Sequence, residues 1–171
     1  MNVRSIGFIC ALLAIGALCA NADENDNGQF RTKLTGFQEV PPKLTDGHGT
    51  FTATLNSDGT SISFTETYTG LTGPAIASHI HFGQPGVNGA IFVFLCGGGG
   101  KPACPSGAGA LTATVTGTIT AADVLSVPAQ GITGGSFSDL LRILRSGDAY
   151  VNVHTPTFPG GEIRGQLKGD D

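Results

Sequence analysis

The sequence predicts an all-β fold, a Greek-key β-sandwich or barrel of about eight strands with one or two short connecting helices. The first observation is a series of short stretches in which apolar and polar residues alternate, separated by turn residues. The second is the content of 27 Gly among 171 residues with no Gly-x-y period, which is typical of a turn-rich β chain. The third is the frequent use of Thr at alternate positions, as on a half-buried pleated surface.

Eight stretches show the strand pattern. They are residues 30–35, 51–55, 62–68, 76–82, 90–95, 111–120, 149–155 and 162–167. The second and third are joined by the turn Asn56-Ser57-Asp58-Gly59, so we expect them to form a hairpin. Short strands at this spacing, with few helices, are typical of a sandwich or small barrel.

Two stretches carry the signals of short helices. Thr120 and Ser136 are each followed three residues later by an aspartate, which is close to a capping box. Gly147 follows the second stretch at the position where a helix commonly ends. We therefore expect one or two short helices between the last strands, packed by their apolar side against the sheet.

The first 22 residues have the order of a secretory signal. Arg4 precedes an apolar run over residues 5–19, and Ala20-Asn21-Ala22 is a small-x-small cleavage pattern. A retained anchor is the alternative, but the run is short for crossing a bilayer. We expect cleavage after Ala22, a flexible leader over 23–29, a domain over 30–168, a tail over 169–171, and a secreted or periplasmic protein without a membrane span.

The charge balance excludes some partners. The chain carries a net charge of −4, and 13% of its residues are charged. Nucleic-acid binding needs a basic face that replaces counterions, and a polybasic membrane binder needs a similar cluster. The remaining partners to expect are an extracellular protein or a glycan.

The mature chain would contain two cysteines, Cys96 and Cys104, because Cys10 and Cys19 lie in the signal. They flank a glycine-rich loop that can bring its ends together, and an oxidising compartment favours a disulfide between them. The alternative is that the two cysteines bind a metal as thiolates, but no further Cys or His stands near them at the spacing of a zinc site.

The most informative motif is His79-Ile80-His81. On a strand the two histidines point to the same side, about 6.6 Å apart at about 3.3 Å per residue. His154 lies on a later strand, on the same face as Asn152, among polar positions. Three such imidazoles can hold one copper or zinc ion and leave a position open for water.

Glu162 and Arg164 follow the turn after His154 and share a face of the last strand. We expect Glu162 to lie near His154 and to orient its ring, with Arg164 and Asn152 beside the site. The alternative is a surface ion pair of little energetic value. A second alternative is that all three histidines only form hydrogen bonds at strand ends.

Three segments resemble the chordin-type CHRD domain. They are residues 34–42 (LTGFQEVPP), 77–89 (ASHIHFGQPGVNG) and 149–167 (AYVNVHTPTFPGGEIRGQL). The resemblance covers residues 30–168 and implies a secreted or periplasmic all-β domain. The cysteine-rich modules that accompany this domain in chordin are absent from the sequence, so growth-factor antagonism is not implied.

A more distant likeness is to copper–zinc superoxide dismutase. It rests on Tyr68-Thr-Gly-Leu-Thr-Gly followed by the His79-Ile-His81 strand, and it implies that His154 stands where a further copper ligand would. Residues 84–95 contain no histidine or aspartate, so the bridging histidine and the zinc loop of that family have no counterpart there.

These observations favour a binding or accessory module over a turnover enzyme. The spacing assigns no catalytic nucleophile, base or pair of carboxylates. One hypothesis is a single copper or zinc ion held by His79, His81 and His154. The other is a protein- or glycan-binding module in which the histidines are structural.

Overall fold

A computed structural model describes residues 28–105 and 111–169 of the chain. The described strands are β1 (Gln29–Thr35), β2 (His48–Leu55), β3 (Ser61–Thr69), β4 (Ala77–Phe82), β5 (Ala90–Cys96), β6 (Ala113–Thr120), β7 (Ala149–His154), β8 (Ile163–Gln166) and β9 (Lys168–Gly169). Eight of them correspond to the predicted strands, with their ends shifted by a few residues. The short strand β9, which pairs with β1, was not predicted.

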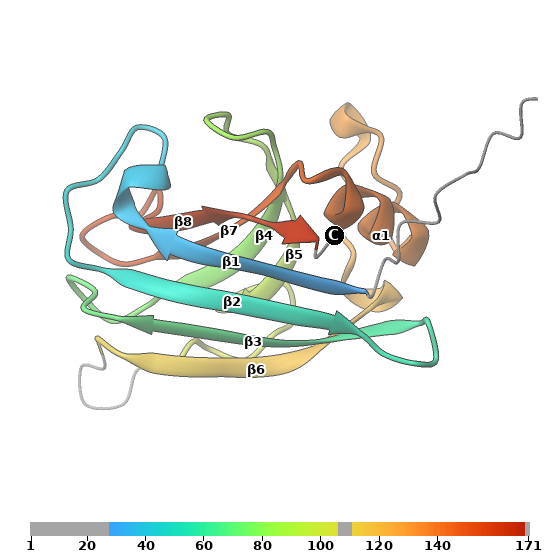
Figure 1. Ribbon diagram of the computed structural model, residues 1–171, viewed down its shortest axis with the longest axis horizontal. Helices are drawn as coiled ribbons and strands as arrows, with labels where there is room; N and C mark the ends of the chain where they lie inside the picture. Colours follow the sequence, from blue (N-terminus) through green and yellow to red (C-terminus); the bar gives the residue numbers. More distant parts are fainter. Residues whose placement is uncertain (1–27, 106–110, 170–171) are drawn as a thin grey trace, which may run out of the picture.

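The strands form one sheet in the order β5-β4-β7-β8-β1-β2-β3-β6, and every pair is antiparallel. Figure 1 shows that the sheet curls round so that β1, β2, β3 and β6 face the layer of β4, β5 and β7. The expected hairpin of β2 and β3 is present, and β3 to β4, β5 to β6 and β6 to β7 are connected by crossovers. This is the predicted Greek-key arrangement in a nearly closed barrel.

Alternate residues of the strands fill the inside of the barrel. Phe51 and Phe64 stack on neighbouring strands with their ring centroids 5.9 Å apart. Ile80, Val151 and Val153 enter the same core from the opposite layer and are fully buried. Successive residues of a strand point to opposite faces. The neighbours of these core residues on β4 and β7 therefore face outward, and they include His79, His81 and His154.

The second predicted helix is confirmed as α1 (Phe137–Ser146). Ser136 caps its first turn by accepting a hydrogen bond from the Asp139 backbone N–H at 3.2 Å, and Gly147 ends it in the left-handed conformation. The first predicted helix is a single 3₁₀ turn, η3 (Ala121–Asp123), although its capping box is present. Two further 3₁₀ turns, η1 (Gly36–Gln38) and η4 (Pro128–Gln130), were not predicted.

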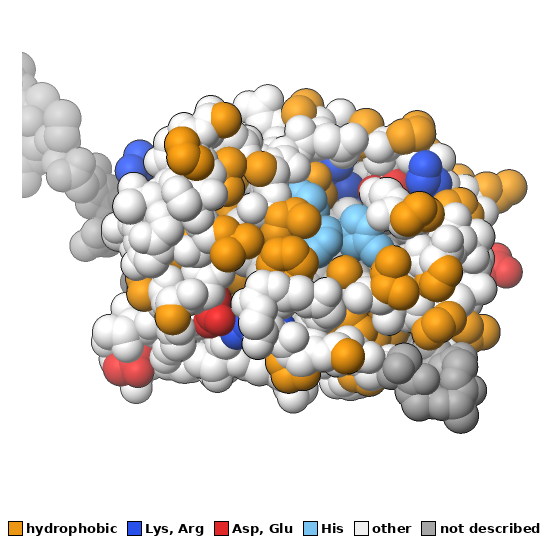
Figure 2. All heavy atoms as spheres, turned by 180° about the vertical axis from the view of Figure 1, so that it is seen from behind, with side chains coloured by type: hydrophobic (Ala, Val, Ile, Leu, Met, Phe, Trp, Pro, Cys, Tyr) orange, Lys and Arg blue, Asp and Glu red, His pale blue; other side chains and the backbone are white. Residues whose placement is uncertain are grey.

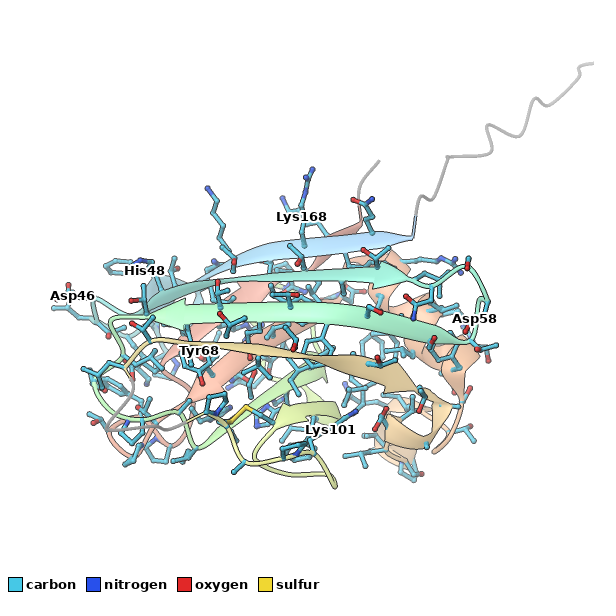
Figure 3. The ribbon with its side chains drawn as sticks, turned by 90° about the horizontal axis from the view of Figure 1, so that it is seen from below. Asp46, His48, Asp58, Tyr68, Lys101 and Lys168 are labelled. Carbon is cyan, nitrogen blue, oxygen red and sulfur yellow. A yellow bond between two sulfur atoms is a disulfide. The ribbon has the colours of Figure 1, made fainter. Side chains whose placement is uncertain are left out.

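The predicted disulfide joins Cys96, at the end of β5, to Cys104. Figure 3 shows it as the yellow bond near the loop that carries Lys101. The Lys101 ammonium donates to the Thr118 carbonyl at 2.9 Å and pairs with Asp123 at 2.8 Å. The disulfide and these contacts hold the glycine-rich loop against β6.

The predicted signal segment, residues 1–22, lies outside the described residues, as do most of the leader and the end of the tail. At the predicted boundaries, β1 already begins at Gln29, and Gly169 belongs to β9 rather than to a tail. Within the described residues, no helix has the length and apolarity that a membrane crossing requires.

Candidate metal centre

The pairing of β4 with β7 brings the three histidines together. The antiparallel register places Ala77 opposite His154 and His79 opposite Asn152. His154 is therefore diagonal to His79 on the outer face, while His81 follows His79 along β4. One potential ligand atom from each histidine lies within 4.8 Å of the other two.

The other neighbour of β4 is irregular at the site. The register between β4 and β5 shifts between Ser78 and His79 and again between Ile80 and His81. Such irregularities bend a strand locally and change the direction of its side chains. One shift directly precedes His79 and the other directly precedes His81, so both imidazoles follow an irregular step of the strand.

The three rings pack closely. The centroid of His79 lies 4.7 Å from that of His81 and 4.4 Å from that of His154. Phe94 of β5 closes one side, with its ring edge-on to His79 at 5.2 Å between centroids. Such packing restricts the rings to one arrangement.

Backbone carbonyls fix the tautomers of two rings. His81 Nδ1 lies 2.9 Å from the Gly89 carbonyl oxygen, and His154 Nδ1 lies 3.0 Å from the Pro159 carbonyl oxygen. A carbonyl only accepts, so Nδ1 must carry the hydrogen in both rings, and a neutral ring then has its lone pair on Nε2. This is the arrangement by which proteins commonly orient a metal-binding histidine.

One ring nitrogen of the cluster has no partner in the described part of the chain, and the other two rings contact each other through theirs. His154 Nε2 is buried and has no hydrogen-bond partner among the described residues. His81 Nε2 lies 2.8 Å from His79 Nδ1 and 3.1 Å from Asn152 Oδ1. A buried lone pair without a donor is unfavourable, and a cation between the three rings would satisfy it.

The surroundings keep the rings neutral. Burial, together with the other histidines, lowers the pKa of His79 to about 3. Burial also lowers the pKa of His81 to about 4 and that of His154 below its usual value. At neutral pH the rings are therefore uncharged, which is the state that binds a metal.

The site retains an opening to solvent. His79 is 4% exposed, and His81 and His154 are each 8% exposed. Figure 2 shows histidine side chains reaching the surface in a hollow among hydrophobic side chains. The three rings are thus largely shielded from solvent but not sealed from the surface.

Glu162 does not have the predicted role. Its carboxylate accepts hydrogen bonds from Thr45, Thr155 and Thr72, at 2.7 to 2.9 Å, and the Pro159 carbonyl is the group that orients His154. Burial would raise the pKa of Glu162, but these hydrogen bonds hold it below its usual value. The two carboxylate oxygens of Glu162 accept four hydrogen bonds in all. Glu162 therefore links the three segments that carry Thr45, Thr72 and Thr155.

Asn152 and Arg164 are buried neighbours on β7 and β8. Asn152 pairs with His79 on one side and Arg164 on the other, and its Oδ1 is the atom next to His81. Arg164 is buried, with its guanidinium 3.4 Å from the centroid of the Tyr150 ring. The alternative of an exposed ion pair is excluded, because both Glu162 and Arg164 are buried.

The structure adds residues that sequence analysis missed. Tyr150 stacks on His81. Glu39 is a buried carboxylate. Burial raises the pKa of Glu39, and Arg164 and Asn152 offset only part of this rise. Glu39 stands in a segment beside two prolines, where a glutamate is ordinarily solvated, so its burial had no signal in the sequence. His48 is exposed on β2, away from the other histidines, and contacts the Asp46 carbonyl (Figure 3).

A comparison with protein-family models matches residues 30–167 to the CHRD domain. The chain belongs to the CHRD domain family. The match runs from β1 through β8 and includes the three histidines, and it confirms the family resemblance. No curated protein and no solved structure matches the chain. The likeness to superoxide dismutase rests on sequence alone and stays a prediction.

Proposed function

We propose that this CHRD domain is an exported accessory module that binds one copper or zinc ion through His79, His81 and His154. The observation that carries the proposal is the pair of backbone carbonyls on Nδ1 of His81 and His154. They leave the lone pair of each of these rings on Nε2, and one ligand atom from each of the three histidines lies within 4.8 Å of the other two. A purely structural histidine would have both nitrogens satisfied, and His154 does not.

The donor set favours these two metals. Neutral imidazole is a ligand for copper and zinc, whereas calcium and magnesium prefer oxygen. Three protein ligands leave a further position for water or a bound molecule. We assign no reaction, because the described residues beside the site include no group that we can place as a nucleophile or base.

Export is supported by independent features. The first 22 residues have the order of a secretory signal, and the Cys96–Cys104 disulfide is typical of an oxidising compartment. In that location a module that holds copper or zinc serves metal binding or redox protection. A protein- or glycan-binding role for the rest of the domain is compatible with the metal site.

The test is metal loading of residues 23–171 without an affinity tag. After dialysis against copper or zinc and removal of free ion, we expect about one equivalent in the wild type, and loss of it in His79→Ala and His154→Ala. His48→Ala is the matched control, because His48 is exposed and outside the cluster. Failure of the wild type to retain either ion, or equal loss in His48→Ala, would contradict the proposal.

A further inference from the structure

A side chain is inserted into the ladder between β1 and β8. The two strands pair at Thr35, and β9 pairs with β1 further along in the same register. Between these pairs the Gln38 amide bridges the strands. Its Nε2 donates to the Lys33 carbonyl at 2.8 Å, and its Oε1 accepts from the Gln166 N–H at 3.4 Å. The strands are therefore held apart at this point by an amide that is fixed on both sides.

The opening contributes to a groove on the outside of the barrel, over β1. Its volume is about 690 Å³, within the range of sites for small ligands. Of the described residues that line the groove, Phe51 is the only one with a large apolar side chain, and it is 1% exposed because it points into the core. The other side chains of the lining are threonines, glutamines and cations. A ligand in this groove meets hydroxyl, amide and positively charged groups.

Three exposed cations stand in the groove, Arg31 and Lys33 on β1 and Lys168 on β9. Arg31 and Lys33 are two residues apart on one strand, so they project from the same face about 6.6 Å apart. Lys168 is paired directly with Arg31, and Figure 3 shows Lys168 on the outside of the barrel beside β1. Like charges at directly opposed positions repel each other. Because no described residue of the lining is acidic, an anion from outside would relieve this repulsion.

The surroundings of the groove narrow the class of anion. β1 is paired with β2 on one side and with β8 and β9 on the other, so an extended peptide finds little free backbone edge there. A membrane-binding cluster has about four to eight basic residues, and nucleic acid needs a longer basic face. An anionic chain rich in hydroxyls matches both the cations and the polar lining.

We propose that this groove binds an acidic glycan chain. Its carboxylate or sulfate groups pair with Lys33 and Lys168, and its hydroxyls contact Thr52 and the Gln38 amide that opens the strands. The proposal goes beyond metal binding and uses none of the three histidines, so it stands or falls separately from the metal centre.

The test is a titration of metal-free residues 23–171 followed by amide chemical shifts. The probes are tetragalacturonate and a heparin-derived tetrasaccharide, with cellotetraose as the neutral comparison and tetraglutamate as the acidic peptide. We expect saturable shifts at residues 31–33 and 166–169 from at least one acidic tetrasaccharide, with a dissociation constant in the millimolar range. The affinity should fall as salt rises, because the cations are exposed. Absence of saturable shifts from both acidic sugars, or equal affinity for cellotetraose or tetraglutamate, would overturn the proposal.

Charge variants test the groove itself. Lys33→Ala and Lys168→Ala should each weaken binding of the acidic tetrasaccharide by about 3- to 10-fold, because each removes a charge-assisted contact. Lys33→Arg keeps the charge and should bind more tightly than Lys33→Ala. Arg142→Ala is the control, since it removes the same charge from α1, outside the groove, where the Arg142 side chain is 84% exposed. Equal weakening in Arg142→Ala and Lys33→Ala would show a general effect of net charge and contradict the proposal.

The sequence ends with Asp170 and Asp171, close to Lys168, and both lie outside the described residues. The double variant Asp170→Asn, Asp171→Asn tests whether these aspartates occupy the groove. We expect it to bind the acidic tetrasaccharide at least as tightly as the wild type, because it loses two negative charges. Binding by this variant alone, with none by the wild type, would assign the cations to the chain's own aspartates and overturn the proposal.

Discussion

The ring of Tyr150 lies parallel to the ring of His81, with 4.5 Å between the centroids and 4° between the planes. The Arg164 guanidinium also lies over the Tyr150 ring, 3.4 Å from its centroid. The Tyr150 hydroxyl accepts a hydrogen bond from the Gly89 N–H, and the Gly89 carbonyl fixes His81. Tyr150 thereby supports a proposed metal ligand in two ways.

Replacing Tyr150 by leucine should reduce affinity for zinc by about 10- to 100-fold, the usual cost of losing a group that orients a ligand. Tyr150→Phe keeps the stacked ring and loses one hydrogen bond, so its affinity should stay closer to the wild type. Competition with a chelator of known affinity measures both. Equal affinities in wild type and Tyr150→Leu would show that the stack does not position His81.

Asn152→Ala should weaken zinc binding by about 10-fold, because the Asn152 side chain lies 3.1 Å from His81 Nε2 and its removal leaves a space into which the ring can move. The same substitution at Asn56, in the turn between β2 and β3, serves as the control, since Asn56 bonds Ser61 and Ser63 away from the site. Chelator competition again gives the affinities. If Asn152→Ala bound zinc as tightly as Asn56→Ala, Asn152 would have no part in the site.

Glu66 should make the stability of the domain fall as pH rises. It is fully buried inside the barrel, where Ser78 donates to one carboxylate oxygen, and burial raises the pKa of Glu66 to about 8. In the unfolded chain its pKa returns to about 4.5, so between these two values unfolding releases a proton. The stabilisation is complete below the lower pKa and is lost progressively towards the higher one.

We therefore expect the free energy of unfolding of the wild type to drop by about 2 to 4 kcal/mol between about pH 5 and about pH 8. Glu66→Gln keeps the shape and cannot ionise, so it should flatten this slope. Urea unfolding across the pH range measures it. A wild-type slope that persists unchanged in Glu66→Gln would assign the effect to another group.

Loss of the disulfide should lower stability without disrupting the proposed metal site. The bond between Cys96 and Cys104 closes a short loop, for which the chain-entropy model gives about 2.5 kcal/mol. The double variant Cys96→Ser, Cys104→Ser should show that loss in urea unfolding and retain its zinc stoichiometry. Loss of zinc binding in the folded variant would mean that the cysteine pair shapes the site through β5.

The strands were predictable because one face of each is buried in the barrel. The alternation of Phe51 and Ala53 with threonines, for example, follows from that burial. The short helix before β7 was predictable from Ser136 and Gly147, which act locally. The stretch after Thr120 forms less helix than its capping box predicted, because the box closes a single 3₁₀ turn and the chain becomes extended at Val124.

The histidines could be placed on one face from period two alone, but their meeting depends on the register of β4 with β7, which no local pattern specifies. The role predicted for Glu162 was wrong for the same reason, because its partners also depend on long-range contacts. The Glu162 carboxylate bonds to Thr45 and Thr72, which lie far from it in the sequence, and not to His154. Glu39 and Tyr150 were missed because their contacts with Asn152, Arg164 and His81 are all long-range.

The most direct test of the metal centre is the imidazole ¹⁵N spectrum of residues 23–171 before and after zinc. We expect His81 and His154 to be Nδ1–H tautomers in the free protein, and zinc to shift Nε2 of both together with Nδ1 of His79. His48 should be unaffected. Nε2–H tautomers in the free protein, or no shift of these nitrogens with zinc, would contradict a three-histidine metal site.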